Sequence, residues 1–290
     1  MRFNKLLIIF AIFLGIFLFL GDDLLDIYSE LSLQLPQFEK EIGDFLIKET
    51  EKQILTPQPL RSQRENPEAL LTQKGIIKWT NIQREKYGFS PLIENEKLNA
   101  SAELKVEDMF EKQYFAHSSP LGVGVGDLLV NVGYEFIIIG ENLALGDFQT
   151  DEILVQAWMD SLGHRENILN TRYQEIGVAA VKGMFEGKST WLAIQHFGVP
   201  LSTCSQPDEI LEVEIKLKQN QIEELHKTLI ALQGKIKNTK PKRGSSYKEM
   251  VDKYNTLISQ YNILINETEV LINQYNNQVI LFNECVVGVE

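Results

Sequence analysis

The feature that most constrains this chain is a three- and four-residue spacing of apolar side chains through its last third. The first part of this region carries the spacing on Leu211, Ile215, Ile222, Leu225, Leu229, Leu232 and Ile236. After a Pro-, Gly- and Ser-containing break at 239–246, a second part carries it on Val251, Tyr254, Ile258, Tyr261, Ile265, Thr268, Ile272, Tyr275, Val279 and Phe282. Sustained seven-residue periodicity is typical of a coiled coil. Residues 201–290 are therefore predicted to form an antiparallel helical hairpin.

The two cysteines of the chain, Cys204 and Cys285, flank this hairpin. The first predicted helix is roughly 46 Å long and the second roughly 58 Å. Residues 204–207 span roughly 13 Å when extended. The two sulfur atoms can therefore meet at the open end of the hairpin, and we predict a disulfide there. Such a bond forms in an oxidising compartment.

The N-terminus begins with two basic residues and an apolar run over 6–20. This order directs a chain to a membrane. Phe19 would occupy a cleavage-site position that needs a small residue, so residues 1–21 are predicted to stay as a transmembrane signal-anchor that contacts the membrane through 3–21. The bulk of the chain then lies outside the cytoplasm. If the segment is cleaved instead, the protein is secreted.

Two further regions follow the anchor. Residues 22–69 show helical periodicity and then a proline-rich stretch, and are predicted to be a helical segment and a linker. Residues 70–200 are predicted to form an α+β domain. Within it we expect helices at 70–88, from Glu94 or Asn95 onward and at 153–158, a loop at 118–126, and strands at 136–139, 176–181 and 190–197.

Composition excludes some classes of protein. The formal net charge of −12 argues against a nucleic-acid partner, which needs a basic face. Neither cysteine has the spacing of a zinc knuckle.

Three ionisable residues stand out in Gly-, Ser- and Asn-rich strings: His117, Glu141 and His164. Two imidazoles and a carboxylate can bind a divalent cation such as Zn²⁺, or can do acid/base chemistry. Asn142 follows Glu141 and is a further candidate for ligand binding. Spacing alone leaves open a second interpretation, in which each residue is a local cap or a satisfied polar anchor.

Five ordered motifs connect this region to a known family: residues 115–120, 140–144, 158–169 with Gly-His-Arg-Glu-Asn-Ile-Leu, 176–178, and 195–198 with Gln-His-Phe-Gly. With these motifs, residues 72–198 resemble a bacterial CAP (SCP-like) domain, of the superfamily of cysteine-rich secretory, antigen 5 and pathogenesis-related proteins. The resemblance implies an α-β-α sandwich whose cleft gathers two histidines and two acidic residues, which hold zinc or another divalent cation in some members.

On the family pattern, His117 matches the first histidine, Glu141 the first glutamate and His164 the second histidine. The second glutamate follows a helix tryptophan by three residues, a position that Ser161 takes here. Asp160 is out of register by about 100° on a helix, and Asp127 is another acid that could take part. The reduced set puts tight metal binding in doubt.

Three functions remain open from the sequence. The first is a non-catalytic cell-envelope module that binds a divalent metal, a lipid or a cell-wall ligand, where lipid binding is implied by eukaryotic relatives. The second is an extracytoplasmic hydrolase, a peptidase or a cell-wall-processing enzyme, that uses the same cleft. The third is a structural or adhesive protein that binds a protein partner or itself through residues 207–285.

Overall fold

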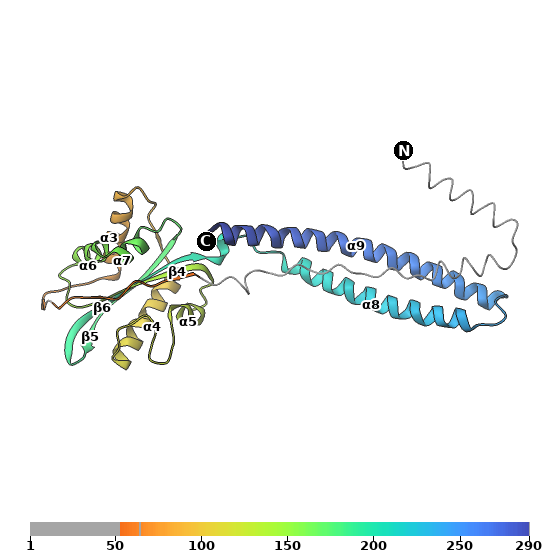
Figure 1. Ribbon diagram of the computed structural model, residues 1–290, viewed down its shortest axis with the longest axis horizontal. Helices are drawn as coiled ribbons and strands as arrows, with labels where there is room; N and C mark the ends of the chain where they lie inside the picture. The colour runs from red at the N-terminus through yellow and green to blue at the C-terminus, as the bar shows by residue number, and fades with distance from the viewer. Residues whose placement is uncertain (1–52, 64, 290) are drawn as a thin grey trace. The chain divides into compact units, whose positions relative to one another are not determined.

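The computed structural model describes residues 53–63 and 65–289, and its helices and strands carry the labels of Figure 1. Contacts divide this part of the chain into two units. The globular unit contains the described residues up to Gln206 and those from Val279 onward, and the helical unit is Pro207–Gln278. The predicted anchor at 1–21 and the segment at 22–52 lie outside the described residues. Within the described range, no helix has the length and apolar character needed to cross a membrane.

The globular unit is built on one mixed six-stranded sheet with the order β1-β4-β6-β5-β3, and β2 pairs with β4 beside β1. The strands are β1 (Gln53–Leu55), β2 (Leu60–Arg61), β3 (Ile93–Glu94), β4 (Phe136–Leu145), β5 (Glu175–Phe185) and β6 (Lys188–Pro200). Strands β4, β6 and β5 pair antiparallel, and this register sets Glu141 of β4 opposite His196 of β6. Every residue of β4 is buried, so this strand forms the centre of the core.

Helices cover both faces of the sheet, as Figure 1 shows. On one side lie α3 (Gln73–Lys86), α6 (Asp151–Asp160) and α7 (Leu162–Ile168), whose apolar side chains join a cluster around Trp158. On the other lie α4 (Glu96–Lys112) and α5 (Val125–Asn131), in clusters around Met109 and Leu129. The unit is therefore an α-β-α sandwich, and the predicted fold class is confirmed.

Local sequence explains where the longer helices begin. Asn95 accepts hydrogen bonds from the backbone N–H groups of Lys97 and Leu98, which makes it the N-cap of α4. Helix α4 then packs so closely on β5 that a Cβ atom at Gly177 would lie 2.1 Å from the backbone carbon of Leu98. Only glycine allows this contact between helix and sheet.

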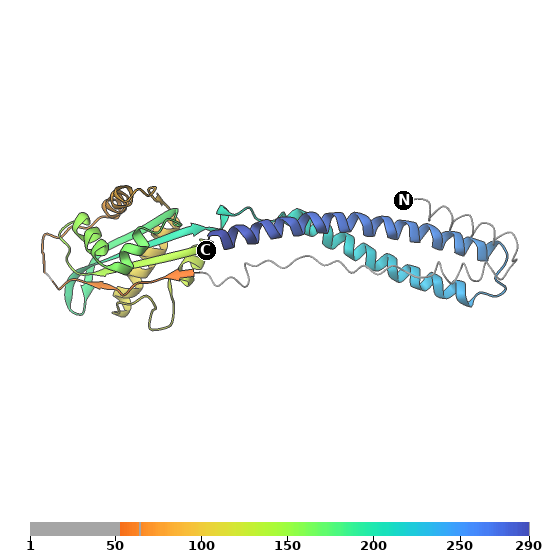
Figure 2. The ribbon, with the colours of Figure 1, turned by 45° about the horizontal axis from the view of Figure 1, so that its top comes forward.

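The structure differs from the sequence prediction at several places. The described part of the expected linker, 53–63, contains β1 and β2, which lie along the edge of β4 in Figure 2. The expected loop at 118–126 ends in α5, and α7 was not predicted. All four elements are seven residues or shorter, so none carries enough periods to show in the sequence, and tertiary contacts decide them.

The helical unit contains α8 (Glu209–Asn238) and most of α9 (Ser245–Val289). Seven-residue spacing appears directly in the buried residues of α8, which are Ile215, Ile222, Leu229 and Ile236. The helices run antiparallel, since Lys218 pairs with Glu267 at 2.9 Å and His226 stacks on Tyr261 at 5.9 Å. These contacts agree with the predicted helical hairpin.

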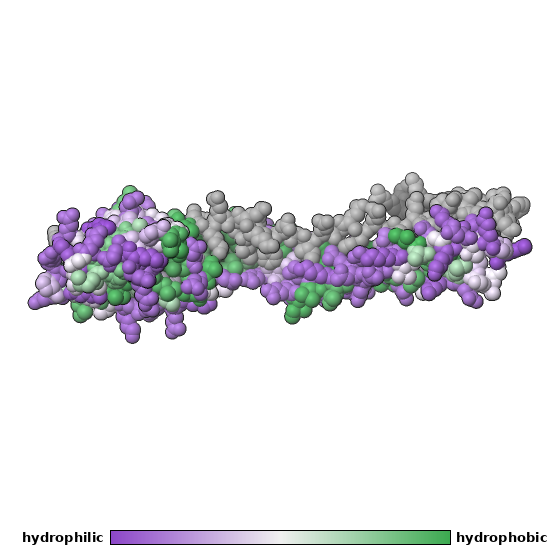
Figure 3. Space-filling view, turned by 90° about the horizontal axis from the view of Figure 1, so that it is seen from below, coloured by the Kyte–Doolittle hydropathy of each residue, from purple (hydrophilic) through white to green (hydrophobic). Residues whose placement is uncertain are grey.

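Polar side chains cover most of the face seen in Figure 3, with apolar ones between them. In the helical unit, large apolar side chains that remain exposed include Val213, Leu217, Ile230, Ile263 and Val270.

The predicted disulfide is confirmed. Cys204 and Cys285 are bonded, with their Cα atoms 5.8 Å apart, and Cys204 is 1% exposed. Phe282 and Val286, from the last turns of α9, join the same apolar cluster as Val199 and Leu201. The end of α9 is thus part of the core of the globular unit.

Candidate functional site

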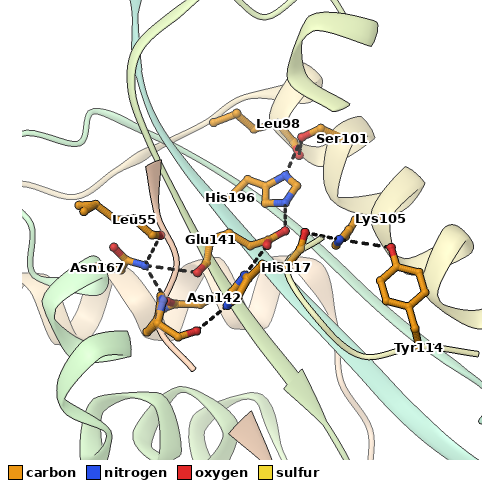
Figure 4. Close-up of polar contacts among 11 residues, drawn as sticks. Leu55, Leu98, Ser101, Lys105, Tyr114, His117, Glu141, Asn142, Asn167 and His196 are labelled. Carbon is orange, nitrogen blue, oxygen red and sulfur yellow. Dashed lines mark hydrogen bonds and ion pairs between the residues drawn. The ribbon is translucent and has the colours of Figure 1, made fainter. Parts of the chain in front are cut away.

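Glu141 lies among the polar residues drawn in Figure 4, with His117 and His196 at its carboxylate. Its side chain is fully buried and accepts hydrogen bonds from His117 Nδ1 at 2.6 Å and His196 Nε2 at 2.9 Å. Burial alone would raise the pKa of this carboxyl. The two hydrogen bonds, with the charges of His196 and Lys105, outweigh burial and lower the pKa to about 2. Glu141 is therefore a carboxylate whose two oxygens are both engaged.

His196 connects Glu141 to helix α4. Its Nδ1 lies 2.7 Å from Ser101 Oγ, and that hydroxyl donates to the carbonyl oxygen of Leu98 at 2.9 Å. The Ser–His–Glu order is that of a nucleophile, a base and an orienting acid. All three side chains are 0% exposed, however, and the Ser101 hydroxyl is bonded to Leu98. The chain of bonds instead ties α4 to the centre of the sheet.

His117 follows α4 in an irregular segment and faces two acceptors. Its Nδ1 bonds Glu141, and its Nε2 bonds the backbone carbonyl oxygen of Pro57. A carboxylate and a carbonyl only accept hydrogen bonds, so His117 faces an acceptor at each ring nitrogen. Beneath this residue the buried Lys105 donates to the carbonyl oxygen of His117 at 2.6 Å and to Tyr114 Oη at 3.3 Å. Burial lowers the pKa of Lys105.

His164 lies in α7 and is 1% exposed. Its Nδ1 contacts Ser161 Oγ at 2.8 Å, while its Nε2 is buried and has no hydrogen-bond partner among the described residues. Burial, and secondly the charge of His117, lower the pKa of His164 to about 4. The ring is therefore neutral near neutral pH. Ser161, at the position of the family's second glutamate, orients the ring.

An amide network holds α7 against the sheet. Asn142 donates to the carbonyl oxygen of His164 at 3.2 Å and to Gln195 Oε1 at 3.1 Å. Asn167 donates to Asn142 Oδ1 at 3.0 Å and to the carbonyl oxygen of Leu55 at 3.2 Å. The structure thus places Asn142, predicted as a ligand-binding residue, within a fully buried network that fixes His164.

Sequence reasoning missed several members of this site. The bond of His196 to Glu141 follows only from the register of β4 and β6. Lys105 could have been recognised from the sequence, because a lysine stands there on the mostly apolar, buried side of α4. The contact of Pro57 with His117 could not be predicted from residue type, since Pro57 contributes its backbone carbonyl.

The arrangement does not fit a metal ion as it stands. In the described part of the chain, no three or more His, Cys, Asp or Glu side chains are arranged to hold one. Both oxygens of Glu141 and both nitrogens of His117 are used in hydrogen bonds, and only His164 Nε2 is open. Asp160 accepts from Gln156, and Asp127 caps α5. The metal site at His117, Glu141 and His164 stays a prediction.

Comparison with known proteins gives a family match over the sandwich. Residues 78–199 match the family model CAP, the cysteine-rich secretory protein family. The Bacillus subtilis "Uncharacterized protein YkwD" is 41% identical over 119 residues, which cover 41% of this chain and 44% of that protein. The "Uncharacterized membrane protein YlbC" of the same bacterium is 29% identical over 126 residues, or 43% and 36% of the two chains.

Solved structures show a weaker likeness. An extracellular protein with an SCP domain from Bacillus anthracis has a TM-score of 0.38 and 28% identity, covering 43% of this chain and 39% of that one. An outer surface protein from Borrelia burgdorferi has a TM-score of 0.38 and 20% identity, covering 44% of this chain and 91% of that one.

The chain matches less than half the length of both curated relatives. The family match also ends before the helical unit, at residue 199. The family model and the sequence relatives together support a CAP (SCP) domain over residues 78–199 of this chain.

Proposed function

We propose that this protein is a non-catalytic binding module of the cell envelope, whose ligand contacts the imidazoles of His117 and His164. The observation that carries the proposal is the unpartnered Nε2 of His164, in a side chain that is 1% exposed. A buried polar atom without a partner costs about 1–3 kcal/mol. A ligand that hydrogen-bonds or coordinates this nitrogen removes that cost.

The chemistry of the site favours binding over catalysis. A hydrolase needs an activated nucleophile or a metal-bound water. Ser101 is the hydroxyl in line with a histidine and a carboxylate, and it is buried with its hydrogen directed at Leu98. The neutral His164 can instead accept or donate one hydrogen bond, or coordinate a divalent cation if His117 is released from its present partners. A lipid or cell-wall ligand remains an alternative to the metal.

We place the protein outside the cytoplasm, attached to the membrane through residues 3–21. The Cys204–Cys285 disulfide supports an oxidising compartment. One relative carries the name of a membrane protein, and the apolar run at 6–20 fits an anchor.

A second function belongs to the helical unit, which we propose is a coiled-coil hairpin that binds a protein partner or a second copy of this chain. Its support is the set of exposed apolar side chains on that unit, which includes Val213, Leu217, Ile230, Ile263 and Val270. Sedimentation of the chain over a range of concentrations tests for self-association. A monomer throughout would count against it.

The binding proposal is tested with two probes, Zn²⁺ and phosphatidylglycerol added as mixed micelles, on the full chain in detergent. Ring-nitrogen NMR follows the histidine signals during each titration. We expect one probe to shift the His164 signal, and expect His164→Ala and His117→Ala to weaken binding while His226→Ala does not. His226 is the matched control because it lies in the helical unit. Unmoved His164 signals with both probes would refute these ligand classes.

A further inference from the structure

The strap, residues 53–61, crosses the histidine site on its way along the sheet edge. Its two ends pair parallel with β4: Gln53, Ile54 and Leu55 stand opposite Ile138, Ile139 and Gly140, and Leu60 and Arg61 opposite Ala144 and Leu145. Residues 56–59 therefore bypass β4 at 141–143, the stretch that carries Glu141. Figure 4 shows Leu55 of the strap beside Asn167 and Glu141.

The strap contacts His117 and the residue that precedes His164. The carbonyl oxygen of Pro57 takes the hydrogen bond of His117 Nε2, and the carbonyl oxygen of Leu55 accepts from Asn167. Pro57 also lies against the first turn of α7, because a Cβ atom at Gly163 would be 2.7 Å from Pro57 Cβ. Gly163 precedes His164, so the strap also packs beside the start of the segment that carries this histidine.

The strap is held by few interactions. Its ladder with β4 covers three residue pairs at one end and two at the other, and the two prolines at 57 and 59 have no N–H to donate. Ile54 is 47% exposed, Thr56 and Gln58 are exposed, and the apolar anchors in the core are Leu55 and Leu60, both partly buried. Short ladders with few buried apolar contacts open locally at low free energy.

Opening of the strap would change which imidazole nitrogens are available to a ligand. In the closed form His117 Nε2 donates to Pro57, which leaves His164 Nε2 as the open ring nitrogen. When the strap leaves, His117 Nε2 loses its partner and joins His164 Nε2 as an imidazole nitrogen that no described residue engages. The backbone carbonyl of Pro57 thus takes the place that a ligand atom would take.

We propose that residues 53–61 are a releasable strap that competes with the ligand for the His117–His164 site. This inference rests on the proposed binding function and adds its regulation. The ligand binds only the form in which the strap is open. The apparent dissociation constant is therefore the intrinsic one divided by the fraction of molecules in the open form. Any event that withdraws residues 53–61 from the edge of β4 then allows the ligand to bind at His117 and His164.

The test compares two charge-matched variants of the full chain in detergent. Leu55→Asp with Leu60→Asp removes both apolar anchors, and Thr56→Asp with Gln58→Asp places the same charges on exposed strap positions. Diethyl pyrocarbonate, read by peptide mass spectrometry, measures how accessible each histidine is. We expect His117 and His164 to react at least about ten-fold faster in the anchor variant than in the exposed-position variant. His226 is the internal control and should react equally in both.

If His117 and His164 each react at the same rate in the two variants, the strap proposal is overturned. Tryptophan fluorescence and the intact disulfide report whether the anchor variant is folded. If it is not, hydrogen exchange of the unmodified chain decides. We expect strap amides to exchange at least about 100-fold faster than those of β6, and equal protection of the two would overturn the proposal.

A Zn²⁺ titration of both variants separates the strap from the binding function. Binding at least about ten-fold tighter in the anchor variant supports the two together. Faster histidine reaction without Zn²⁺ binding supports the strap and counts against a metal ligand. Zn²⁺ affinity that is equal in both variants overturns the competition.

Discussion

The buried Glu141 gives the sharpest prediction, because its hydrogen bonds to His117 and His196 set the magnitude. Replacing it by glutamine keeps the shape but removes the charge that faces His117 and His196. Breaking one side of a buried hydrogen-bonded ion pair costs about 3–5 kcal/mol. The pKa gives a similar figure, since a fall from 4.5 to about 2 corresponds to about 3 kcal/mol of folding free energy. We therefore expect Glu141→Gln to destabilise the globular unit by about 3–5 kcal/mol near neutral pH.

The sign of the pH dependence follows from the direction of the shift. Glu141 has a folded pKa below its unfolded value, so its stabilisation is present above about 4.5 and is lost as pH falls toward about 2. The stability difference between the parent and Glu141→Gln should therefore be constant above about pH 5 and should narrow below it.

Urea unfolding followed by tryptophan fluorescence measures this difference. The chain's three tryptophans, Trp79, Trp158 and Trp191, all lie in the globular unit, so the helical unit does not contribute to the signal. Glu65→Gln is the control, because the side chain of Glu65 is 78% exposed, and it should change stability by less than about 0.5 kcal/mol. A loss below about 1 kcal/mol for Glu141→Gln, or a difference that does not narrow in acid, would refute the reasoning.

Three further outcomes follow from the structure. The folded pKa of His164, about 4, lies below its ordinary 6.5, so stability should fall by about 3 kcal/mol as pH drops between these values; His164→Leu should remove that part of the pH profile in urea titrations. Replacing Cys204 and Cys285 by serine should cost about 4 kcal/mol on chain-entropy grounds for a separation of 81 residues, measured by thermal unfolding with and without reductant. Gly177→Ala should lower the free energy of unfolding by at least about 1–3 kcal/mol, because its Cβ meets the backbone of α4. The control is Gly234→Ala in α8, where the added Cβ meets open space, and it should be neutral or stabilising. Calorimetry measures both.

The elements that the sequence could predict are those whose signals repeat. The helical hairpin shows its period over many turns, and Asn95 marks the start of α4 by its capping chemistry. The sandwich was expected from the resemblance to the CAP family and from the two long strands of the β5–β6 hairpin. By contrast, β1 and β2 have three and two residues, and their pairing with β4 is a long-range contact that no local pattern encodes.

The same distinction applies to the site. His117, Glu141 and His164 could be singled out because they are ionisable residues in Gly- and Asn-rich strings. The contact of Glu141 with His196 depends on the register of two strands, which places residues 55 apart in sequence side by side. The contact of His117 with Pro57 depends on a backbone carbonyl, which every residue has. Side-chain identity therefore reveals which residues can do chemistry, and only the fold reveals which partners occupy them.

The disulfide places helix α8 and most of helix α9 within a closed covalent ring. Because the end of α9 returns to the core beside Cys204, the pair is an insertion into the globular unit. Residues 204–285 form a closed covalent ring. A protease that cuts once in the turn between α8 and α9 would leave a single molecule under non-reducing conditions. The same cut after reduction would leave the C-terminal fragment, with Phe282 and Val286, held to the rest by packing alone.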